Sequence, residues 1–549
     1  MSEKLTGGEA VLRSVLRHGV DTIFGLPGVQ TYPLFDALAR HGNAIRTLGV
    51  RHEQTAAYMA MGYAKVTGRP GVYSVVPGPG VLNTGAALIT GMAVNAPMLL
   101  LTGQVPAPFL GRGRGHLHEL PDQAGTLASF IKWAGRVPRA AEAPAVVDEA
   151  FARMLGGRPG PVSVEMCWDT MAQSESVALP PVAAAAPPPP PDPAALYASV
   201  DVIRAAQRPM IMVGNGAQHA SAEVLALAEA LGAPVTAFRG GRGVVDEAHA
   251  LGVSSVAAYE LWPETDLLIG IGSRCEMQAM RWSGMTDAGA SLGGGRKLIR
   301  IDIDAEEMLR LRPDVGIVAD AAAGASALAA ACAAGAADMP ARLAAIAAAK
   351  EAARAKVAVL TPHVDYLAAI RAALPPEGIF VKDICQTGFA SYLSFPVHRP
   401  RTYVTSGYQG TLGFAFPTAL GAKVGRPDQP VVCVTGDGGF MFAAQELSTA
   451  AQHGIAVVTV VFNNRAYGNV RRDQANQFDG RVIASDLPPI DYMKMAQSLG
   501  VEAAQTDTPA GLGALLTKAI AADTPYLIEV TLDLADEVSP WPLIVPGRG

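Results

Sequence analysis

Short runs of apolar residues alternate along the chain with segments of helical length. In the first third, "GVYSVV" and "PMLLLTG" flank one such segment. "PMIMVG", "DLLIGIG" and "KLIRIDID" recur in the middle, and "GIFVKD", "PVVCVTGDG" and "IAVVTVVFNN" follow in the last third. Near-continuous Val and Ile runs between helices are typical of parallel strands that are buried on both faces. The pattern therefore predicts an α/β protein with three doubly wound parallel-sheet domains.

Two segments of low complexity divide the chain. The proline-rich stretch "ALPPVAAAAPPPPPDPAA", which ends at Ala195, predicts a linker because it cannot pack as helix or sheet. An alanine-dominated region from about Ala319 to Val357 predicts helix. We therefore expect an N-terminal domain over 1–178, a central domain over 195–340 and a C-terminal domain over 358–549, which fits the length of 549 residues.

Composition and charge narrow the class of protein. Half of the residues are hydrophobic, 17% are charged and the formal net charge is −6. Without a long basic run, neither nucleic acid nor a membrane is an expected partner. The five cysteines lack metal-ligand spacing, which predicts free thiols. "MSEKLTGGEA" has no apolar signal core, and the apolar stretch 86–103 is broken by Asn95 and Pro97, so we expect a cytoplasmic protein.

Two polar positions follow neighbouring predicted strands in the last domain. Asp437 lies in a Gly-Asp-Gly-Gly turn between "VVCVT" and the predicted helix "FMFAAQELSTAAQHG", and Asn464 ends the next strand. In a right-handed βαβ unit both strands point the same way, so the two side chains emerge at one sheet edge. Their oxygens suit Mg²⁺ or Ca²⁺, and the glycine N–H groups suit a phosphate. A Mg²⁺–diphosphate ligand satisfies both halves, whereas ordinary turn chemistry is the alternative.

These residues carry a resemblance to a known family. "GDG", a helix-sized spacer and "NN" resemble the thiamine diphosphate motif. "FGLPG", "RHEQTAAYMAMGYAKVTGRPGV", "GRPGPVSVEM" and "GTLGFAFPTALGAK" are similar to the acetolactate synthase and benzaldehyde lyase branch of those enzymes. The resemblance implies a pyrimidine-binding, a central and a diphosphate-binding domain, in that order, with thiamine diphosphate and Mg²⁺ as cofactors.

The resemblance also implies roles for individual residues at the metal and diphosphate. Asp437 and Asn464 would hold Mg²⁺ by their side chains, and Ala466 would add its backbone carbonyl. Gly439 stands where many relatives have serine, which removes one hydroxyl contact. The other residues implied at the cofactor are Ile384, Cys385, Gln386, Thr387, Gly410, Leu412, Gly436 and Gly438.

Activation of the cofactor is expected to depend on Glu53. Taken alone, Glu53 is a helix-opening acid that the helix dipole favours. The resemblance makes it the carboxylate at the aminopyrimidine ring, while Leu412 would hold the cofactor bent and Gly410 would accept a hydrogen bond from the exocyclic amine. In this family the activating glutamate and the metal site come from different subunits. A homodimer is then the minimum unit, and a homotetramer is expected.

The substrate pocket departs from the family pattern. His118 aligns with a catalytic glutamine and could move protons near neutral pH; the alternative is a solvated loop histidine. Further candidates for the pocket are Val29, Gln30, His116 and Arg471. Asn469 and Asp473 replace a methionine and a tryptophan of acetolactate synthases, and the adjacent Arg471 and Arg472 could bind a substrate anion or be surface charges.

The sequence does not decide which ligand the central domain binds. Arg274, Asp302 and Asp304 stand where relatives contact FAD or an ADP-like group. FAD is possible, although the histidine motif that usually accompanies it is absent from "LGVSSVAAYELW".

The sequence thus predicts an enzyme that resembles acetolactate synthase. It would decarboxylate a 2-keto acid, or form C–C bonds, through a thiazolium-bound carbanion, with a 2-keto acid or 2-hydroxy carbonyl compound as substrate. A lyase acting on 2-hydroxy ketones or 2-hydroxyacyl-CoA is the enzymatic alternative. A non-catalytic relative that keeps the cofactor fold is the other.

Overall fold

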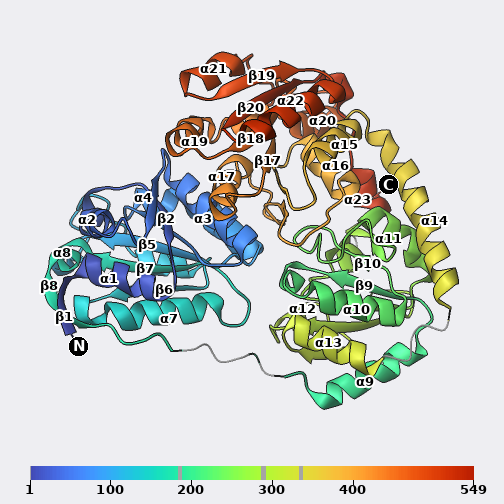
Figure 1. Ribbon diagram of the computed structural model, residues 1–549, viewed down its shortest axis with the longest axis horizontal. Coiled ribbons are helices and arrows are strands. Elements are labelled where there is room, and N and C mark those ends of the chain that lie inside the picture. The colour runs from blue at the N-terminus through green and yellow to red at the C-terminus, as the bar shows by residue number, and fades with distance from the viewer. Residues whose placement is uncertain (1, 184–187, 189, 286–291, 333–337, 549) are drawn as a thin grey trace.

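Three six-stranded parallel sheets form the computed structural model, one in each third of the chain (Figure 1). The structure describes residues 2–183, 188, 190–285, 292–332 and 338–548. Helices cover both faces of the sheets, so the prediction of a doubly wound α/β fold is confirmed. Among the described residues, no helix combines the length and apolarity that a membrane crossing requires.

The N-terminal sheet has the strand order β3-β2-β4-β5-β7-β6. Its strands are β2 (Thr22–Gly25), β3 (Arg46–Gly49), β4 (Gly71–Val75), β5 (Met98–Gln104), β6 (Trp133–Val137) and β7 (Val162–Cys167). The surrounding helices are α1 (Gly7–Arg17), α2 (Tyr32–Arg40), α3 (Glu53–Thr67), α4 (Pro79–Asn83), α5 (Gly85–Ala93), α6 (Gln123–Ala128), α7 (Ala143–Leu155) and α8 (Trp168–Ala172). An antiparallel pair, β1 (Ser2–Thr6) and β8 (Ser174–Ala178), ties the start of the domain to its end.

The central sheet has the order β11-β10-β9-β12-β13-β14. Its strands are β9 (Pro209–Val213), β10 (Val235–Thr236), β11 (Gly252–Val253), β12 (Leu267–Ile271), β13 (Lys297–Asp302) and β14 (Val315–Val318). Its helices are α9 (Pro193–Ala205), α10 (Ser221–Leu231), α11 (Ser255–Leu261), α12 (Glu307–Arg310) and α13 (Ala321–Ala331). The long helix α14 (Met339–Val357) leads on to the C-terminal domain (Figure 1).

The C-terminal sheet has the order β16-β15-β17-β18-β20-β19. Its strands are β15 (Ile379–Lys382), β16 (Tyr403–Val404), β17 (Val431–Gly436), β18 (Val457–Asn463), β19 (Glu502–Thr506) and β20 (Tyr526–Thr531). Its helices are α15 (His363–Ala373), α16 (Gln386–Ser394), α17 (Ala415–Gly425), α18 (Asp437–Phe440), α19 (Leu447–His453), α20 (Gly468–Gln477), α21 (Tyr492–Ser498), α22 (Pro509–Ala522) and α23 (Trp541–Ile544).

One sequence expectation about an element is wrong. The segment "FMFAAQELSTAAQHG" was expected to form one helix, but α18 ends at Phe440 and α19 begins at Leu447. The two glycines of α18 are weak helix formers. Glu446 is fully buried between the halves, where its carboxylate accepts hydrogen bonds from the Arg51 backbone and the Thr449 hydroxyl. These tertiary contacts replace the continuous helix.

The two low-complexity segments are described only in part. Residues 184–187 and 189 of the expected linker and residues 333–337 of the alanine-rich region lie outside the described residues. On either side of the second gap, α13 and α14 are helical as expected.

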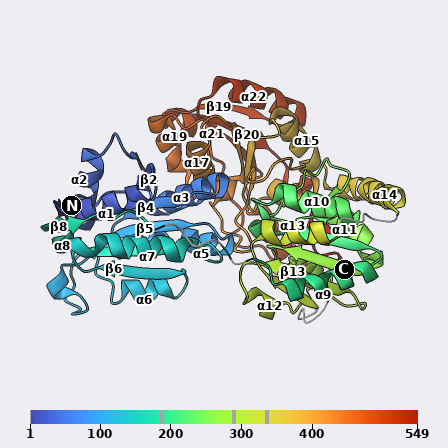
Figure 2. The same cartoon turned by 60° about the horizontal axis from the view of Figure 1, so that its bottom comes forward.

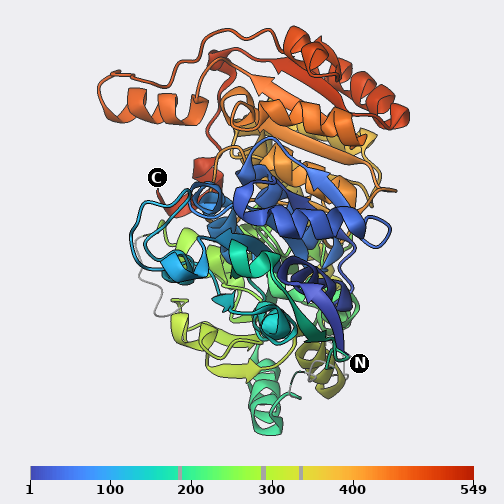
Figure 3. The same ribbon diagram turned by 90° about the vertical axis from the view of Figure 1, so that its left-hand side faces the viewer.

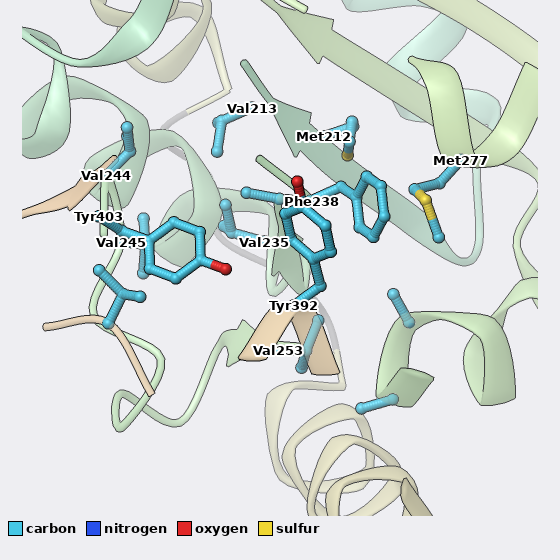
Figure 4. Close-up of a cluster of buried hydrophobic side chains, with 14 of the residues drawn as sticks. Met212, Val213, Val235, Phe238, Val244, Val245, Val253, Met277, Tyr392 and Tyr403 are labelled. Atoms are coloured by element: carbon cyan, nitrogen blue, oxygen red, sulfur yellow. The ribbon is translucent and has the colours of Figure 1, made fainter. Parts of the chain in front are cut away.

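The C-terminal domain packs against both other domains (Figure 2). Where the N-terminal domain faces the viewer, the C-terminal domain lies above it (Figure 3). One buried apolar cluster joins the central and C-terminal domains, and in it the tilted rings of Phe238 and Tyr392 lie 4.6 Å apart between their centroids (Figure 4). A second cluster joins the N- and C-terminal domains through α3 and α17. Gly62 and Gly421 face the partner helix's backbone so closely that a Cβ at either would overlap a carbonyl.

Candidate active site

Three parallel strands of the C-terminal sheet end at one edge. β15, β17 and β18 are consecutive neighbours there, and each is followed directly by a polar or glycine-rich turn. Ligands of open α/β sheets bind at this carboxyl edge because the loops diverge there and leave a crevice. A pocket lies at this edge.

Most of the residues that the resemblance implies at the cofactor line this pocket. Ile384 to Thr387 and Gly436 to Gly439 lie on its wall with Leu412, Asn464 and Ala466. Gly410 does not line it; its φ of +60° instead shapes the turn that presents Leu412. The remaining lining residues are His363, Asp383, Phe389, Phe462, Tyr467, Gly468, Asn469, Val470, Leu532 and Glu537.

Asp437 is a buried carboxylate at the start of α18. Its side chain is near the backbone N–H groups of Gly438, Arg465 and Ala466, which places it beside the turn that follows β18. Burial raises the pKa of Asp437 to about 6, and these N–H groups only partly oppose the shift. A buried carboxylate of this kind suits a metal ion.

A second carboxylate, Glu537, orients the amide of Asn464. Asn464 donates from Nδ2 to Glu537 Oε1 at 2.6 Å, which turns its Oδ1 toward the backbone N–H of Ala466 at 3.2 Å. Burial raises the pKa of Glu537, and Asp437 adds to the shift while Arg472 and Asn464 oppose it. Glu537 was not predicted from the sequence, because it lies 73 residues from Asn464 in the chain and no motif connects the two positions.

The donors in the pocket fit a hard cation and a polyanion together. Asp437, Asn464 and Ala466 offer one charged and two neutral oxygens, the kind of set that Mg²⁺ accepts. Among the described residues there is no cluster of three or more His, Cys, Asp and Glu, as a zinc site would present. The pocket wall also holds buried polar atoms that have no hydrogen-bond partner within the described part of the chain, Gln386 Oε1, His363 Nε2 and Glu537 Oε2. Such atoms are satisfied by a bound polar ligand or water.

Glu53 opens α3 in the N-terminal domain. His52 caps the helix by accepting from the Gln54 N–H, and the Glu53 side chain is 17% exposed. Asn83 donates to Glu53 Oε2 at 3.0 Å, so the carboxylate is held in one direction. Glu53 does not line the C-terminal pocket, whose wall begins at His363 in the chain.

The predicted substrate residues His118 and Gln30 meet in the N-terminal domain. Nδ1 of His118 lies 2.8 Å from Oε1 of Gln30. The backbone of His118 faces Gly78, and Gly80 faces the Glu53 side chain, so the loop 78–80 connects His118 with Glu53. Val29 is exposed beside Gln30, whereas the ring of His116 contacts Phe109, 4.2 Å away.

The two adjacent arginines lie in different places. Arg471 makes an ion pair with Asp486 at 2.6 Å and does not line the pocket. Arg472 is inward and largely buried, beside Asn469 and 3.8 Å from Glu537. Asn469 lines the pocket and also accepts from the indole of Trp541, and Asp473 lies 3.6 Å from Arg472.

A separate cleft follows the carboxyl ends of β9, β12 and β13 in the central domain. Arg274 and Asp302 line it, and the Arg274 guanidinium stacks on Tyr408 at 4.6 Å. Asp304 instead makes an ion pair with Arg158 at 3.5 Å. Lys65 and Arg401 also line the cleft, where Gly214 and Gly216 pack against the backbone of Gly272.

Comparison with known proteins gives matches along the whole chain. The thiamine pyrophosphate enzyme N-terminal TPP binding domain matches residues 5–126, the central domain 196–328 and the C-terminal TPP binding domain 383–530. The large subunit of acetolactate synthase isozyme 1 from Escherichia coli is 30% identical, over 99% of this chain and 97% of that protein. A probable acetolactate synthase large subunit from Methanococcus aeolicus is 31% identical, over 99% and 94%. A probable 2-ketoarginine decarboxylase from Pseudomonas aeruginosa is 34% identical, over 89% and 86%.

Proposed function

The chain belongs to the thiamine pyrophosphate enzyme family, as a thiamine diphosphate-dependent carboligase or decarboxylase of the acetolactate synthase-like branch, and from this premise we propose that it decarboxylates a 2-keto acid with the help of Mg²⁺. One observation carries the proposal: a buried carboxylate, an amide oxygen and a backbone carbonyl meet beside glycine N–H groups in one pocket. This donor set matches a metal-bound diphosphate.

The proposed roles follow from the positions of the side chains. Bound thiamine diphosphate supplies a carbon nucleophile and an electron sink for the carbonyl carbon. Asp437, Asn464 and the Ala466 carbonyl would hold Mg²⁺, and Gly438 and Gly439 would donate N–H groups to the diphosphate. Glu53, held by Asn83, would share a proton with a ring nitrogen. His118 would move a proton at the substrate oxygen.

Decarboxylation is favoured over acetolactate synthesis by the residues on α20. Asn469 replaces the methionine expected of acetolactate synthases and is bound to Arg472 and Trp541. The decarboxylase relative is 34% identical, compared with 30% and 31% for the two synthases named above. Arg472 does not line the pocket itself, but it lies beside the pocket residues Asn469 and Glu537, so of the two arginines it is the one proposed to interact with an anionic group of the substrate.

A shared site between two copies of the chain is part of the proposal. Glu53 lies outside the pocket wall of its own chain, so a second subunit would supply it. Exposed apolar side chains at the seam of the N- and C-terminal domains support this arrangement: Leu82, Ile89, Leu412, Met441 and Phe442. At this seam, the hydroxyl oxygens of Thr90 and Thr411 are hydrogen-bonded at 2.9 Å. A homodimer is the minimum unit, and a homotetramer fits the family.

The central cleft is proposed to take an ADP group, which FAD and coenzyme A share. It lies at a carboxyl sheet edge with cations for the diphosphate and the acidic Asp302 at the end of β13. A flavin absorption spectrum in the purified protein would identify FAD. Binding of ADP to flavin-free protein would identify the nucleotide without the flavin, and absence of both would reject the proposal.

The reaction is tested by mass spectrometry of products. Enzyme loaded with thiamine diphosphate and Mg²⁺ is incubated with a panel of 2-keto acids that includes 2-ketoarginine, and with 2-hydroxy ketones and acyl-CoAs. We expect an aldehyde and CO₂ from at least one 2-keto acid. Cleavage of a 2-hydroxy compound alone would replace the decarboxylase by the lyase, and no product from loaded enzyme would favour a non-catalytic relative.

A further inference from the structure

A chain of hydrogen bonds determines which nitrogen of His118 carries a proton. Nε2 of Gln30 donates to the backbone carbonyl of Leu117 at 2.7 Å. A carbonyl oxygen can only accept, so the amide nitrogen must face Leu117 and the amide oxygen must face His118. Since Oε1 of Gln30 can only accept as well, Nδ1 of His118, 2.8 Å away, must be the donor.

The other arrangements place two acceptors face to face. If the amide of Gln30 were reversed, its oxygen would oppose the Leu117 carbonyl. If His118 carried its proton on Nε2, the lone pair of Nδ1 would oppose Gln30 Oε1. Gln30 is 4% exposed, so water cannot replace the lost partner. The arrangement with the proton on Nδ1 is therefore the one that satisfies every group.

We propose that Gln30 is a positioning residue that sets the tautomer of His118 and leaves Nε2 as the atom through which the ring takes up and releases protons. This proposal rests on the proposed function, in which His118 moves protons. In the neutral ring Nε2 has the free lone pair, and in the protonated ring Nδ1 still donates to Gln30. His118 thus alternates between base and acid without turning its ring.

Both partners are held in place by their own surroundings. Gln30 lies in the single turn Val29–Thr31, which is closed by hydrogen bonds between Gly28 and Thr31. Across from it, Gly103 packs so closely that a Cβ would overlap the Gln30 carbonyl. The turn cannot shift toward β5.

The backbone of His118 is held in an unusual conformation. Its φ is +63°, in the left-handed region that residues other than glycine rarely adopt. The His118 carbonyl packs against Gly78, whose N–H donates to Oε1 of the buried Gln123 at 2.9 Å. Strain of this kind persists where the surroundings fix it and is concentrated at functional sites.

The tautomer can be read directly by NMR. The protein is labelled with ¹⁵N-histidine, loaded with thiamine diphosphate and Mg²⁺, and studied above the pKa of the ring by long-range ¹H–¹⁵N correlation. His118→Gln assigns the signal, and the remaining histidines are internal controls. We expect a protonated Nδ1 and a free Nε2 in His118, the reverse of the form that free histidine prefers. A protonated Nε2 in the wild-type protein would overturn the proposal.

Two variants separate positioning from packing. Gln30→Met keeps the chain length but removes the acceptor, so His118 should revert toward the Nε2-protonated form. Turnover of the identified keto acid should fall about tenfold, less than the roughly 10²-fold or larger loss for His118→Ala. Gln30→Glu restores an acceptor, and its charge should move the His118 limb of the pH–rate profile to higher pH. An unchanged tautomer in Gln30→Met, or no recovery of the Nδ1 proton in Gln30→Glu, would contradict the proposal.

The test distinguishes this proposal from the proposed function. If no 2-keto acid is turned over while the spectra show the expected tautomers, the reaction assigned above is wrong and the role of Gln30 as tautomer-setting residue stands. If turnover is observed and Gln30→Met leaves the tautomer unchanged, the reaction stands and the role of Gln30 is rejected.

Discussion

At the scale of single residues, the two buried carboxylates of Asp437 and Glu537 make the pocket negatively charged. Burial raises the pKa of both carboxylates. The nearby charge of Asp437 raises the pKa of Glu537 further. Arg472, 3.8 Å from Glu537, and the amide of Asn464 oppose this shift in the pKa of Glu537. A pocket with excess negative charge and adjacent backbone donors is complete only with a cation and an anion bound together.

The metal assignment predicts that Asp437→Ala abolishes tight binding of thiamine diphosphate. The variant removes the charged oxygen ligand from a site that must also neutralise a diphosphate. Calorimetry with Mg²⁺ present measures the affinity, and removal of Mg²⁺ by chelation should weaken wild-type binding in the same way. Asp428→Ala, in the exposed turn before β17, is the matched control and should bind normally. Equal affinity of both variants would contradict the assignment.

The buried His363 side chain should make the free energy of unfolding depend on pH. Burial lowers the pKa of His363 to about 4, from 6.5 in the unfolded chain. Between these values the unfolded state binds the extra proton, so the free energy of unfolding rises with pH from about 4 to 6.5. The full difference corresponds to roughly 3 kcal/mol. His363→Gln should flatten this part of the stability curve, measured by denaturant unfolding of the cofactor-free protein.

The matched variant for His363 is His41→Gln, because His41 is partly exposed at the surface. It should leave the slope between pH 4 and 6.5 nearly unchanged. If both variants have the same slope as the wild-type protein, the buried imidazole is not the group that couples folding to pH in this range.

The roles of single residues could be predicted from the sequence only where local geometry brings the residues together. Asp437 and Asn464 each directly follow a strand of one βαβ unit, and the structure accordingly places both in one pocket. The contacts of Glu537 with Asn464, of Asn83 with Glu53 and of Gln30 with His118 join positions that are far apart in the chain. No spacing rule connects such positions, so these contacts required the fold, although His118 and Gln30 were each candidates from the sequence.

At the scale of elements, the crossing of α3 and α17 sets the position of Glu53, the proposed activating residue. Glu53 is the first residue of α3, and Leu412 and Gly410 precede α17 by a few residues. Gly62 and Gly421 allow the two backbones to approach closely. A change in the distance between these helices would therefore move both Glu53 and the turn that holds Leu412, two residues proposed to act on the cofactor.

Gly421→Ala should destabilise this crossing. The added Cβ would overlap the Met59 carbonyl, and a backbone carbonyl cannot move aside as a flexible side chain can. Overpacking of this kind costs about 1–3 kcal/mol, which thermal unfolding measures as a lower midpoint. Gly513→Ala in α22, where the nearest atom to the new Cβ is 3.8 Å away, is the control and should maintain or raise the midpoint. A higher midpoint for Gly421→Ala would show that the crossing is loosely packed.

The strands were more predictable than the helices. Runs such as "VVCVTGDG" are buried on both faces, and this burial is visible as an unbroken apolar stretch. The break between α18 and α19 was not visible, since it depends on Glu446 accepting a hydrogen bond from Arg51 in another domain. Helix continuity in this region is decided by tertiary contacts that override local propensity.

At the scale of the whole molecule, the arrangement of three domains separates the two halves of the proposed site. The metal and diphosphate residues occupy the C-terminal sheet edge, and Glu53 and His118 belong to the N-terminal domain. The central domain packs on the C-terminal domain through the aromatic cluster around Phe238 and Tyr392. A second copy of the chain would complete the site without any change of fold.

Complementation tests this shared site. Glu53→Gln and Asp437→Ala each inactivate a different half, so neither variant alone should be active. After subunits are exchanged at equal amounts, half of the dimers are mixed and each mixed dimer has one intact site. Activity should return to about a quarter of the wild-type value. No recovery, although exchange is verified by mass spectrometry, would place both halves of the site in one subunit.

The account depends most directly on Glu53 as the group that activates the cofactor. Glu53→Gln preserves the size of the side chain and the contact with Asn83, but it cannot share a proton with the pyrimidine nitrogen. The decisive measurement is hydrogen–deuterium exchange at the thiazolium carbon of the bound cofactor, followed by quenched NMR. We predict that exchange slows by roughly 10²–10⁴-fold, while cofactor affinity falls much less because Asp437 and the diphosphate turn anchor it. An unchanged exchange rate with the cofactor fully bound would contradict the account, and Glu53 would then be only a helix-opening charge.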